Sequence, residues 1–274
     1  GHEATGRVIK IGNGVKKIKT GDNVCLTWVF SKGFNAGGSI YKSKKKKINA
    51  GPVNTFSNYA IISENKIQKL NKNSNIKKSV LLGCAAPTAF NCIFLNTKNP
   101  KKKNILILGC GGVGLLTVYA ANLLKFKEIK VVDKFSKKIK IAKKLGATDF
   151  IPIPDLKNYE DSFDYVVECT GNTKMINESI RYAKKYGGQV FVVGNYKNKT
   201  EIKIDPWQLL LGKKISGSWE RKFNYDKHIS NFEKYLINFK SKYFFGEKIY
   251  RLNQINSALK DFKNGKVIRP LIKM

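Results

Sequence analysis

A glycine-rich turn between an apolar strand and a helix constrains this chain more than any other feature. NILILG, residues 104–109, is a continuous apolar run typical of a buried strand, and CGGVGLLTVYAANLLKF has helical apolar spacing after it. The glycines of GCGGVG form the pattern G-x-G-x-x-G. In this context they allow a tight turn, a close backbone approach to a pyrophosphate and close helix–strand packing. The predicted cofactor-binding residues of this turn are Gly109, Gly111, Gly112, Val113 and Gly114.

An acidic residue follows the turn at the distance that dinucleotide binding requires. Asp133 ends a second apolar strand, IKVVD, and stands 19 residues beyond Gly114. A carboxylate there accepts hydrogen bonds from the adenosine ribose and repels a 2′-phosphate, which favours NAD over NADP. Lys134 and Lys138 weaken the preference for NAD without reversing it. Lys138 is also one of the predicted cofactor-binding residues. The alternative is that Asp133 is only an acid at a helix N-terminus.

Strands and helices alternate over the middle of the chain. After IKVVD come the helical segment SKKIKIAKKLGA, a strand in FDYVVECTG, a helix in TKMINESIRYAKKYGG and the strand QVFVVG. This alternation with short loops predicts a parallel, doubly wound α/β sheet. Residues 1–70 are instead β-rich, and a helical pattern over residues 76–96 is expected to break at Pro87. The chain ends on an amphipathic helix and a last strand.

Four segments together resemble the zinc-dependent medium-chain alcohol dehydrogenases, in family order and nearly from end to end. They are GHEATGRV, LLGCAAPTAF, GCGGVG with Asp133, and INSALKDFKNGKVIRPLI. The resemblance implies a Rossmann doubly wound sheet plus a β-rich GroES-like catalytic domain that is incomplete at its N-terminal side. The implied domains are residues 1–85 for the GroES-like part, 86–218 for the NAD-binding part and 219–274 for a return to the catalytic domain.

The same resemblance implies a zinc site and further cofactor contacts. His2 and Cys84 match catalytic zinc ligands, and Glu3 matches a residue beside the metal. Thr88 matches a residue near the nicotinamide, and Arg269 one that holds the pyrophosphate. Imidazole and thiolate suit zinc, which lowers the pKa of a bound alcohol before hydride transfer. Each residue also has an ordinary alternative: an exposed histidine, a cysteine that packs in an apolar helix, or a surface arginine.

Two departures from the family pattern bear on activity. The family places another cysteine ligand and a proton-relaying Ser or Thr before GHE, so we expect this sequence to be a fragment whose own activity is uncertain. Many members also carry four close cysteines that bind a structural zinc, whereas CLTWVFSKGFNAGGSIYKSKKKKINAG contains only Cys25. One thiolate cannot form such a site, so the structural zinc is predicted to be absent. A homo-oligomer is expected, but its size stays open.

The charge and the cysteine content limit which binding partners and which cellular compartment are expected. The chain has 52 basic and 19 acidic residues and a net charge of +33, which could indicate a polyanion partner. Of the basic residues 47 are lysines spread along the chain, and only KSKKKK, residues 42–47, is a local patch, so we expect no nucleic-acid partner. No apolar run approaches the ~18 residues of a membrane span. Five scattered cysteines favour a reducing cytoplasm.

The sequence therefore predicts a zinc-dependent oxidoreductase that transfers hydride between an alcohol and NAD(H), interconverting alcohols and aldehydes or ketones. The alternatives are a zinc-independent enzyme similar to quinone reductases, a non-catalytic NAD-binding protein, and a nucleic-acid-binding module. GHE and Cys84 together argue against the first of these. The choice of substrate is expected to depend on loops such as SGSWERKFNYDK, where Trp219 either faces a cleft or packs.

Overall fold

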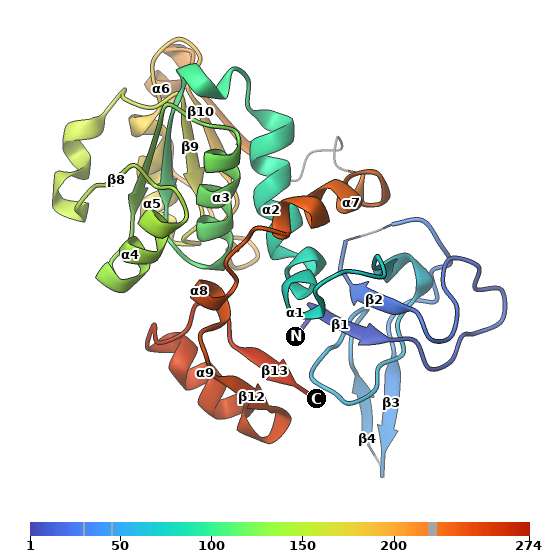
Figure 1. Cartoon of the computed structure of the whole chain (residues 1–274). Coiled ribbons are helices and arrows are strands. Elements are labelled where there is room, and N and C mark those ends of the chain that lie inside the picture. Colours follow the sequence, from blue (N-terminus) through green and yellow to red (C-terminus); the bar gives the residue numbers. More distant parts are fainter. Residues whose placement is uncertain (30, 45, 219–223) are drawn as a thin grey trace. The chain divides into compact units, whose positions relative to one another are not determined.

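The computed structural model describes residues 1–29, 31–44, 46–218 and 224–274 (Figure 1). The chain divides into two compact units. Unit 1 comprises Gly1–Pro87 with Asn224–Met274, and unit 2 comprises Thr88–Phe223. Trp219 and its loop, and the first residues of the expected segment 219–274, lie outside the described residues.

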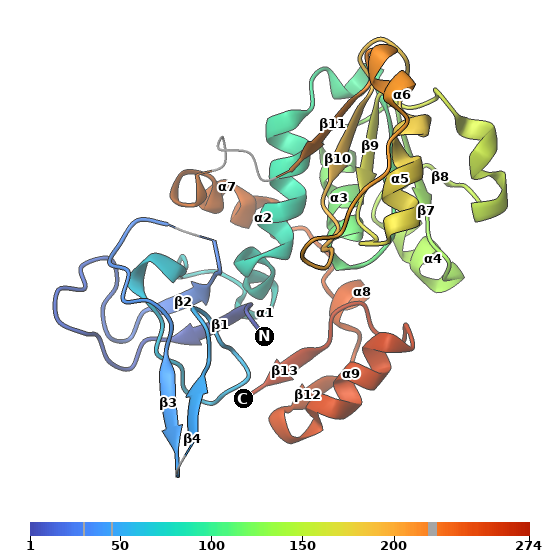
Figure 2. The same ribbon diagram turned by 180° about the vertical axis from the view of Figure 1, so that it is seen from behind.

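Unit 2 is built on a six-stranded parallel sheet in the order β11-β10-β9-β6-β7-β8. Helix α3 (Gly112–Leu123) covers the face seen in Figure 1, and α5 (Thr173–Tyr182) covers the face seen in Figure 2. The predicted doubly wound sheet is therefore confirmed. The strands are β6 (Asn104–Leu108), β7 (Glu128–Val132), β8 (Asp149–Phe150), β9 (Tyr165–Glu168), β10 (Gln189–Val192) and β11 (Lys214–Gly217).

The strand order reverses between β6 and β9. From β6 the chain proceeds through β7 and β8 to one edge, then returns to β9 and continues to β11 at the other edge. Residues Ile105–Leu108 of β6 are fully buried because helices cover both faces of the sheet, which explains their continuous apolar run. In open α/β sheets a crevice for ligands forms at such a reversal, beyond the carboxyl ends of the strands.

Unit 1 is β-rich, as expected. Its main sheet is antiparallel, in the order β1-β2-β5, and a separate hairpin is formed by β3 and β4. The C-terminal segment adds a parallel pair, β12 and β13, with α9 between them in the chain. The elements are β1 (Ala4–Arg7), β2 (Asn23–Leu26), β3 (Ile40–Ser43), β4 (Lys46–Asn49), β5 (Ile67–Lys69), α7 (Tyr225–Leu236), α8 (Lys242–Phe245), β12 (Ile249–Arg251), α9 (Ile255–Lys263) and β13 (Leu271–Lys273).

The helical stretch around Pro87 does not break where we expected. The break falls at Cys84, whose φ of −159° and ψ of −62° interrupt the helix. Pro87 is the third residue of α2 (Ala85–Phe90), and a proline in the first helical turn is tolerated because its missing N–H would have no partner there. Among the described residues no single helix is both long and apolar enough to cross a bilayer, and only a bent pair of helical stretches reaches that length.

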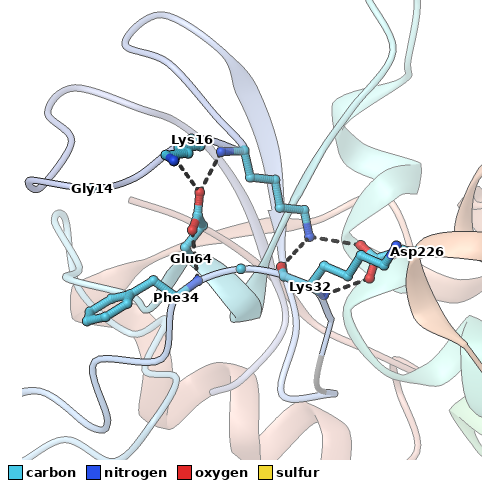
Figure 3. A pocket seen from close by; sticks show the side chains of 8 residues that line it. Gly14, Lys16, Lys32, Phe34, Glu64 and Asp226 are labelled. Carbon is cyan, nitrogen blue, oxygen red and sulfur yellow. Dashed lines mark hydrogen bonds and ion pairs between the residues drawn. The ribbon is translucent and has the colours of Figure 1, made fainter.

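A buried carboxylate holds the loops of unit 1 together (Figure 3). Glu64 is 7% exposed and accepts hydrogen bonds from the backbone N–H groups of Lys16 at 2.7 Å, Lys17 at 2.5 Å and Phe34 at 2.8 Å. Nearby, the Lys17 ammonium forms an ion pair with Asp226 at 3.0 Å. The bond from Phe34, with those from Lys17 and Lys16, lowers the pKa of Glu64 against the opposing effect of burial.

This arrangement predicts that unit 1 is sensitive to acid. Because the folded-state pKa of Glu64 is lowered, its contribution to stability is full above the ordinary glutamate pKa of about 4.3 and is lost as the pH falls through the lowered value. The melting temperature of Glu64→Gln should therefore vary less with pH than that of the wild type below about pH 5. The exposed Glu247→Gln is the matched control. Parallel melting curves for Glu64→Gln and wild type would contradict the assignment.

Candidate dinucleotide and metal sites

The glycine turn lies directly after β6, at the reversal of the sheet. Gly109 has a φ of +95°, a left-handed conformation that favours glycine, and a Cβ there would approach Thr170 Cγ2 to 2.8 Å. A Cβ on Gly114 would come 1.8 Å from the Gly109 carbonyl oxygen, so the packing of the helix on the turn requires glycine there. Gly111 differs, because a Cβ there would meet nothing within 4 Å.

The protein itself therefore does not require glycine at position 111. Gly111 is the N-cap of α3, and its φ of −77° and ψ of −166° are open to any residue. The space beside it lies at a helix N-terminus, where free N–H groups and the helix dipole favour an anion. Gly112 and Val113 are the first residues of that helix. The predicted turn residues thus come together, and the turn fits a pyrophosphate.

Asp133 follows β7 and holds the glycine turn in place. One carboxylate oxygen accepts from the Cys110 N–H at 2.8 Å, and the other from the Phe135 N–H at 2.9 Å. Each oxygen can accept a second bond, so a ribose hydroxyl can still be bound. Lys138 Nζ is 4.0 Å from Asp133 Oδ2 and 4.7 Å from the centre of the Phe135 ring, and Lys134 Nζ is 5.0 Å from the same ring. This second function of Asp133, as a link between turn and strand, is one that the sequence analysis missed.

The candidate metal residues of unit 1 lie around Glu3. Glu3 Oε1 accepts from the Ala85 N–H at 2.8 Å, and Glu3 Oε2 pairs with the Arg269 guanidinium. A Cβ on Gly83 would lie 3.2 Å from Glu3 Cα, so the segment beside Cys84 packs directly against the segment that carries His2. The backbone of Arg269 is also held in place, because its backbone N–H donates to the Phe244 carbonyl at 3.0 Å.

The donors fit zinc in kind but do not complete a site. Burial, with Arg269 and against the effect of Glu3, lowers the pKa of His2, which favours the neutral imidazole that a metal ligand requires. The Cys84 side chain is half-buried. Both carboxylate oxygens of Glu3 already have partners, Ala85 and Arg269, so Glu3 does not serve as a third zinc donor in this structure. Across the described residues there is no group of three or more His, Cys, Asp or Glu side chains that could hold a metal. Catalytic zinc sites use three protein ligands, so His2 and Cys84 alone leave the site short of one.

Thr88, the residue expected near the nicotinamide, and Cys25, the lone cysteine of the expected zinc-free lobe, are both buried. Thr88 is 8% exposed and belongs to unit 2, within α2. Cys25 is fully buried, and its thiol donates to the Ser79 carbonyl at 3.3 Å. Burial also raises the pKa of the Cys25 thiol, as expected for a cysteine that packs in a core.

One buried polar group near the reversal of the sheet was not foreseen. Glu168 ends β9 with no exposed surface, and its carboxylate accepts from the hydroxyls of Thr170 and Tyr196. A signal for it existed in the sequence, since a glutamate interrupts the apolar strand in FDYVVECTG.

Comparison with known proteins agrees with both units. Residues 1–72 match the family model for the alcohol dehydrogenase GroES-like domain, and residues 112–239 match that for zinc-binding dehydrogenases. The chain is 28% identical over 252 residues to an S-(hydroxymethyl)glutathione dehydrogenase of Escherichia coli, a match that covers 80% of this chain and 68% of the relative.

Solved structures are similar over the whole chain. An alcohol dehydrogenase zinc-binding domain protein from Burkholderia ambifaria has a TM-score of 0.81 at 25% identity, and benzyl alcohol dehydrogenase from Acinetobacter calcoaceticus has a TM-score of 0.76 at 25% identity. Both matches cover 100% of this chain and 83% of the other. Alcohol dehydrogenase TADH from Thermus sp. ATN1 shares the fold with a TM-score of 0.80 at 18% identity.

A parallel Rossmann sheet joined in one chain to a GroES-like domain defines the class of medium-chain oxidoreductases. Within that class, the chain belongs to the zinc-dependent alcohol dehydrogenase family. Its reaction class is the interconversion of alcohols with aldehydes or ketones, and the family generally uses zinc and NAD(H). The predicted family, fold class and reaction class are confirmed.

Proposed function

We propose that the chain binds NAD(H) in unit 2 and transfers hydride between this cofactor and a small alcohol or carbonyl compound. The open space at Gly111, beside the N-terminus of α3 and the reversal of the sheet, is the observation that carries the proposal. Asp133 supports NAD over NADP, and Thr88 is proposed to contact the nicotinamide. Unit 2 is then the nucleotide-binding domain and unit 1 the GroES-like catalytic domain, with the domain limits of the sequence analysis kept as a proposal.

His2 and Cys84 are the residues proposed to hold one zinc ion, with Glu3 beside it. When bound, zinc supplies Lewis-acid polarisation of the substrate oxygen. The role of Glu3 follows from its contacts, since it fixes the N-terminus of α2 behind Cys84 and orients Arg269. Arg269 in turn is a proposed anion-binding group for the pyrophosphate. The absence of a structural zinc stays a prediction.

The zinc proposal has a direct test in metal content. Purified protein should hold about one zinc ion per chain, and His2→Ala or Cys84→Ser should lose at least roughly 90% of it, since even outer-shell changes lower metal affinity ~10- to 100-fold. His228→Ala, which removes a half-buried histidine on α7, is the matched control. Elemental analysis after dialysis measures the result. Equal zinc in all four proteins would place the metal elsewhere.

Activity tests the proposed function as a whole. Wild-type protein with NAD and zinc should reduce the cofactor in the presence of an alcohol, monitored as NADH absorbance. The substrates of the relatives, S-(hydroxymethyl)glutathione and benzyl alcohol, are the first compounds to try. In the part of the chain that the structure describes, no third donor joins His2 and Cys84, which favours a second candidate, a non-catalytic NAD-binding protein. NADH binding without turnover and without bound zinc would select that candidate.

A homo-oligomer is proposed from the edge of the unit 2 sheet. Strand β11 forms one edge of the sheet. The helix that precedes it in the chain, α6 (Pro206–Leu210), exposes Trp207, Leu209 and Leu210, the last at 74%. Exposed apolar side chains beside an open strand edge are typical of an association surface. Leu210→Glu should therefore shift the protein to a smaller species in light scattering. An unchanged mass would mean that the contact is not at this surface.

The five free cysteines keep the reducing cytoplasm as the proposed location.

A further inference from the structure

Glu168 is a carboxylate that is fully buried at the end of β9. It has 0% exposure, and among the described residues no lysine or arginine forms an ion pair with it. A buried charge is costly unless hydrogen bonds replace its hydration. Glu168 lies at the carboxyl end of β9, where the strand order reverses.

Hydroxyl and amide donors surround the carboxylate. The Thr170 N–H donates to Glu168 Oε1 at 2.7 Å, the Thr170 hydroxyl donates to the same oxygen, and the Tyr196 hydroxyl donates to Oε2. Burial and the bond to Glu168 raise the pKa of Tyr196, so its hydroxyl stays protonated and remains a donor. The donors come from two loops, one after β9 and one after β10.

These two loops are packed backbone to backbone over the carboxylate. A Cβ on Gly194 would lie 2.4 Å from Glu168 Oε2 and 2.5 Å from the Gly171 nitrogen. A Cβ on Gly171 would lie 2.8 Å from the Asn195 carbonyl oxygen. The Val193 and Gly194 N–H groups both donate to the Glu168 carbonyl at 2.9 Å. Glycine is thus required on both loops for the carboxylate to be enclosed.

The same network reaches the glycine turn. Thr170, which Glu168 holds by two bonds, lies against Gly109, because a Cβ on Gly109 would meet Thr170 Cγ2 at 2.8 Å and the Thr170 nitrogen at 3.3 Å. Rossmann sheets bind a dinucleotide with two mononucleotide halves. Strands β6, β7 and β8, with Asp133, form the half for adenosine. The Glu168 network belongs to the other half, formed by β9, β10 and β11.

We propose that Glu168, with Thr170 and Tyr196, is a positioning residue for the nicotinamide half of the cofactor. By clamping the loops after β9 and β10 against the glycine turn, it preforms one wall of the dinucleotide crevice. The proposal rests on the proposed NAD(H) site, but it assigns a distinct group and a distinct half of the ligand. Preformed walls raise affinity because less ordering is required on binding.

The test compares two ligands in the full chain. Tyr196→Phe and Thr170→Val each remove one hydroxyl with little change of shape. Each should weaken NADH binding about tenfold, measured by fluorescence titration, while the affinity for 5′-AMP, which lacks the nicotinamide half, changes less than about twofold. Thr170→Ser keeps the hydroxyl and should restore NADH binding. Glu201→Gln, an exposed carboxylate of unit 2, is the control.

These outcomes test the positioning of the two loops by Glu168, Thr170 and Tyr196 (the clamp) separately from the proposed NAD(H) binding. An equal loss of NADH and 5′-AMP affinity would mean a general loosening of unit 2 and would overturn the clamp, as would unchanged NADH binding. If the wild type binds neither ligand, the proposed function fails, and hydrogen exchange of the free protein decides on the clamp. Faster exchange in Tyr196→Phe at the amides of Thr170, Val193 and Gly194 and in the glycine turn supports it, and unchanged exchange there overturns it.

Discussion

Replacing Gly111 with alanine should weaken NADH binding roughly 100-fold and leave the protein folded. A Cβ at position 111 meets no protein atom within 4 Å and needs no change of backbone, so the free energy of unfolding should stay within about 0.5 kcal/mol of the wild type. The methyl group would instead occupy the space proposed for the pyrophosphate. We expect the dissociation constant for NADH to rise by roughly 100-fold, which corresponds to about 2.7 kcal/mol of overpacking.

Gly114→Ala should have the opposite pattern. Its Cβ would lie 1.8 Å from the Gly109 carbonyl oxygen, a backbone atom that cannot move without displacing the turn. We expect a loss of about 3 kcal/mol or more in the free energy of unfolding, measured by urea denaturation. Gly12→Ala, where a Cβ also meets nothing, is the control for both variants. If Gly111→Ala bound NADH normally, the phosphate site would not be at this turn.

Asp133→Asn should relax the choice between NADH and NADPH. The change removes the negative charge that repels a 2′-phosphate, whereas the ammonium groups of Lys134 and Lys138 remain beside the Phe135 ring. We expect the ratio of NADPH to NADH affinity to rise at least about tenfold, since a hydrogen bond to a charged group contributes ~1.5–3 kcal/mol. Fluorescence titration with both cofactors measures the ratio.

A ratio of affinities protects this test from the structural function of Asp133. Its carboxylate also accepts from the N–H groups of Cys110 and Phe135, so the variant should lose some stability whatever it does to binding. That loss affects both cofactors alike and cancels in the ratio. The double variant with Lys138→Gln should lose part of the gained NADPH affinity. If the ratio stayed that of the wild type, Asp133 would act only as a link between the turn and β7.

Much of unit 2 could be predicted because its determinants are local. The strand before the turn, the spacing of the glycines and the helix after it are read within residues 104–124, and buried parallel strands require continuous apolar runs. The predicted position of the break in the helical stretch was wrong, and the reason is local as well. Pro87 was expected to end a helix, but it occupies the first turn of α2, where its missing N–H has no effect.

The sequence by itself determined the alternation of strands and helices, the glycine turn and the family, because each depends on residues that are close along the chain. Only the tertiary structure decided which side chains meet. Glu3 and Arg269 are 266 positions apart yet form an ion pair, and Glu168 reaches Tyr196 on a different loop. No periodicity encodes such contacts, since they depend on the order of strands in the sheet and on glycines that let two backbones approach.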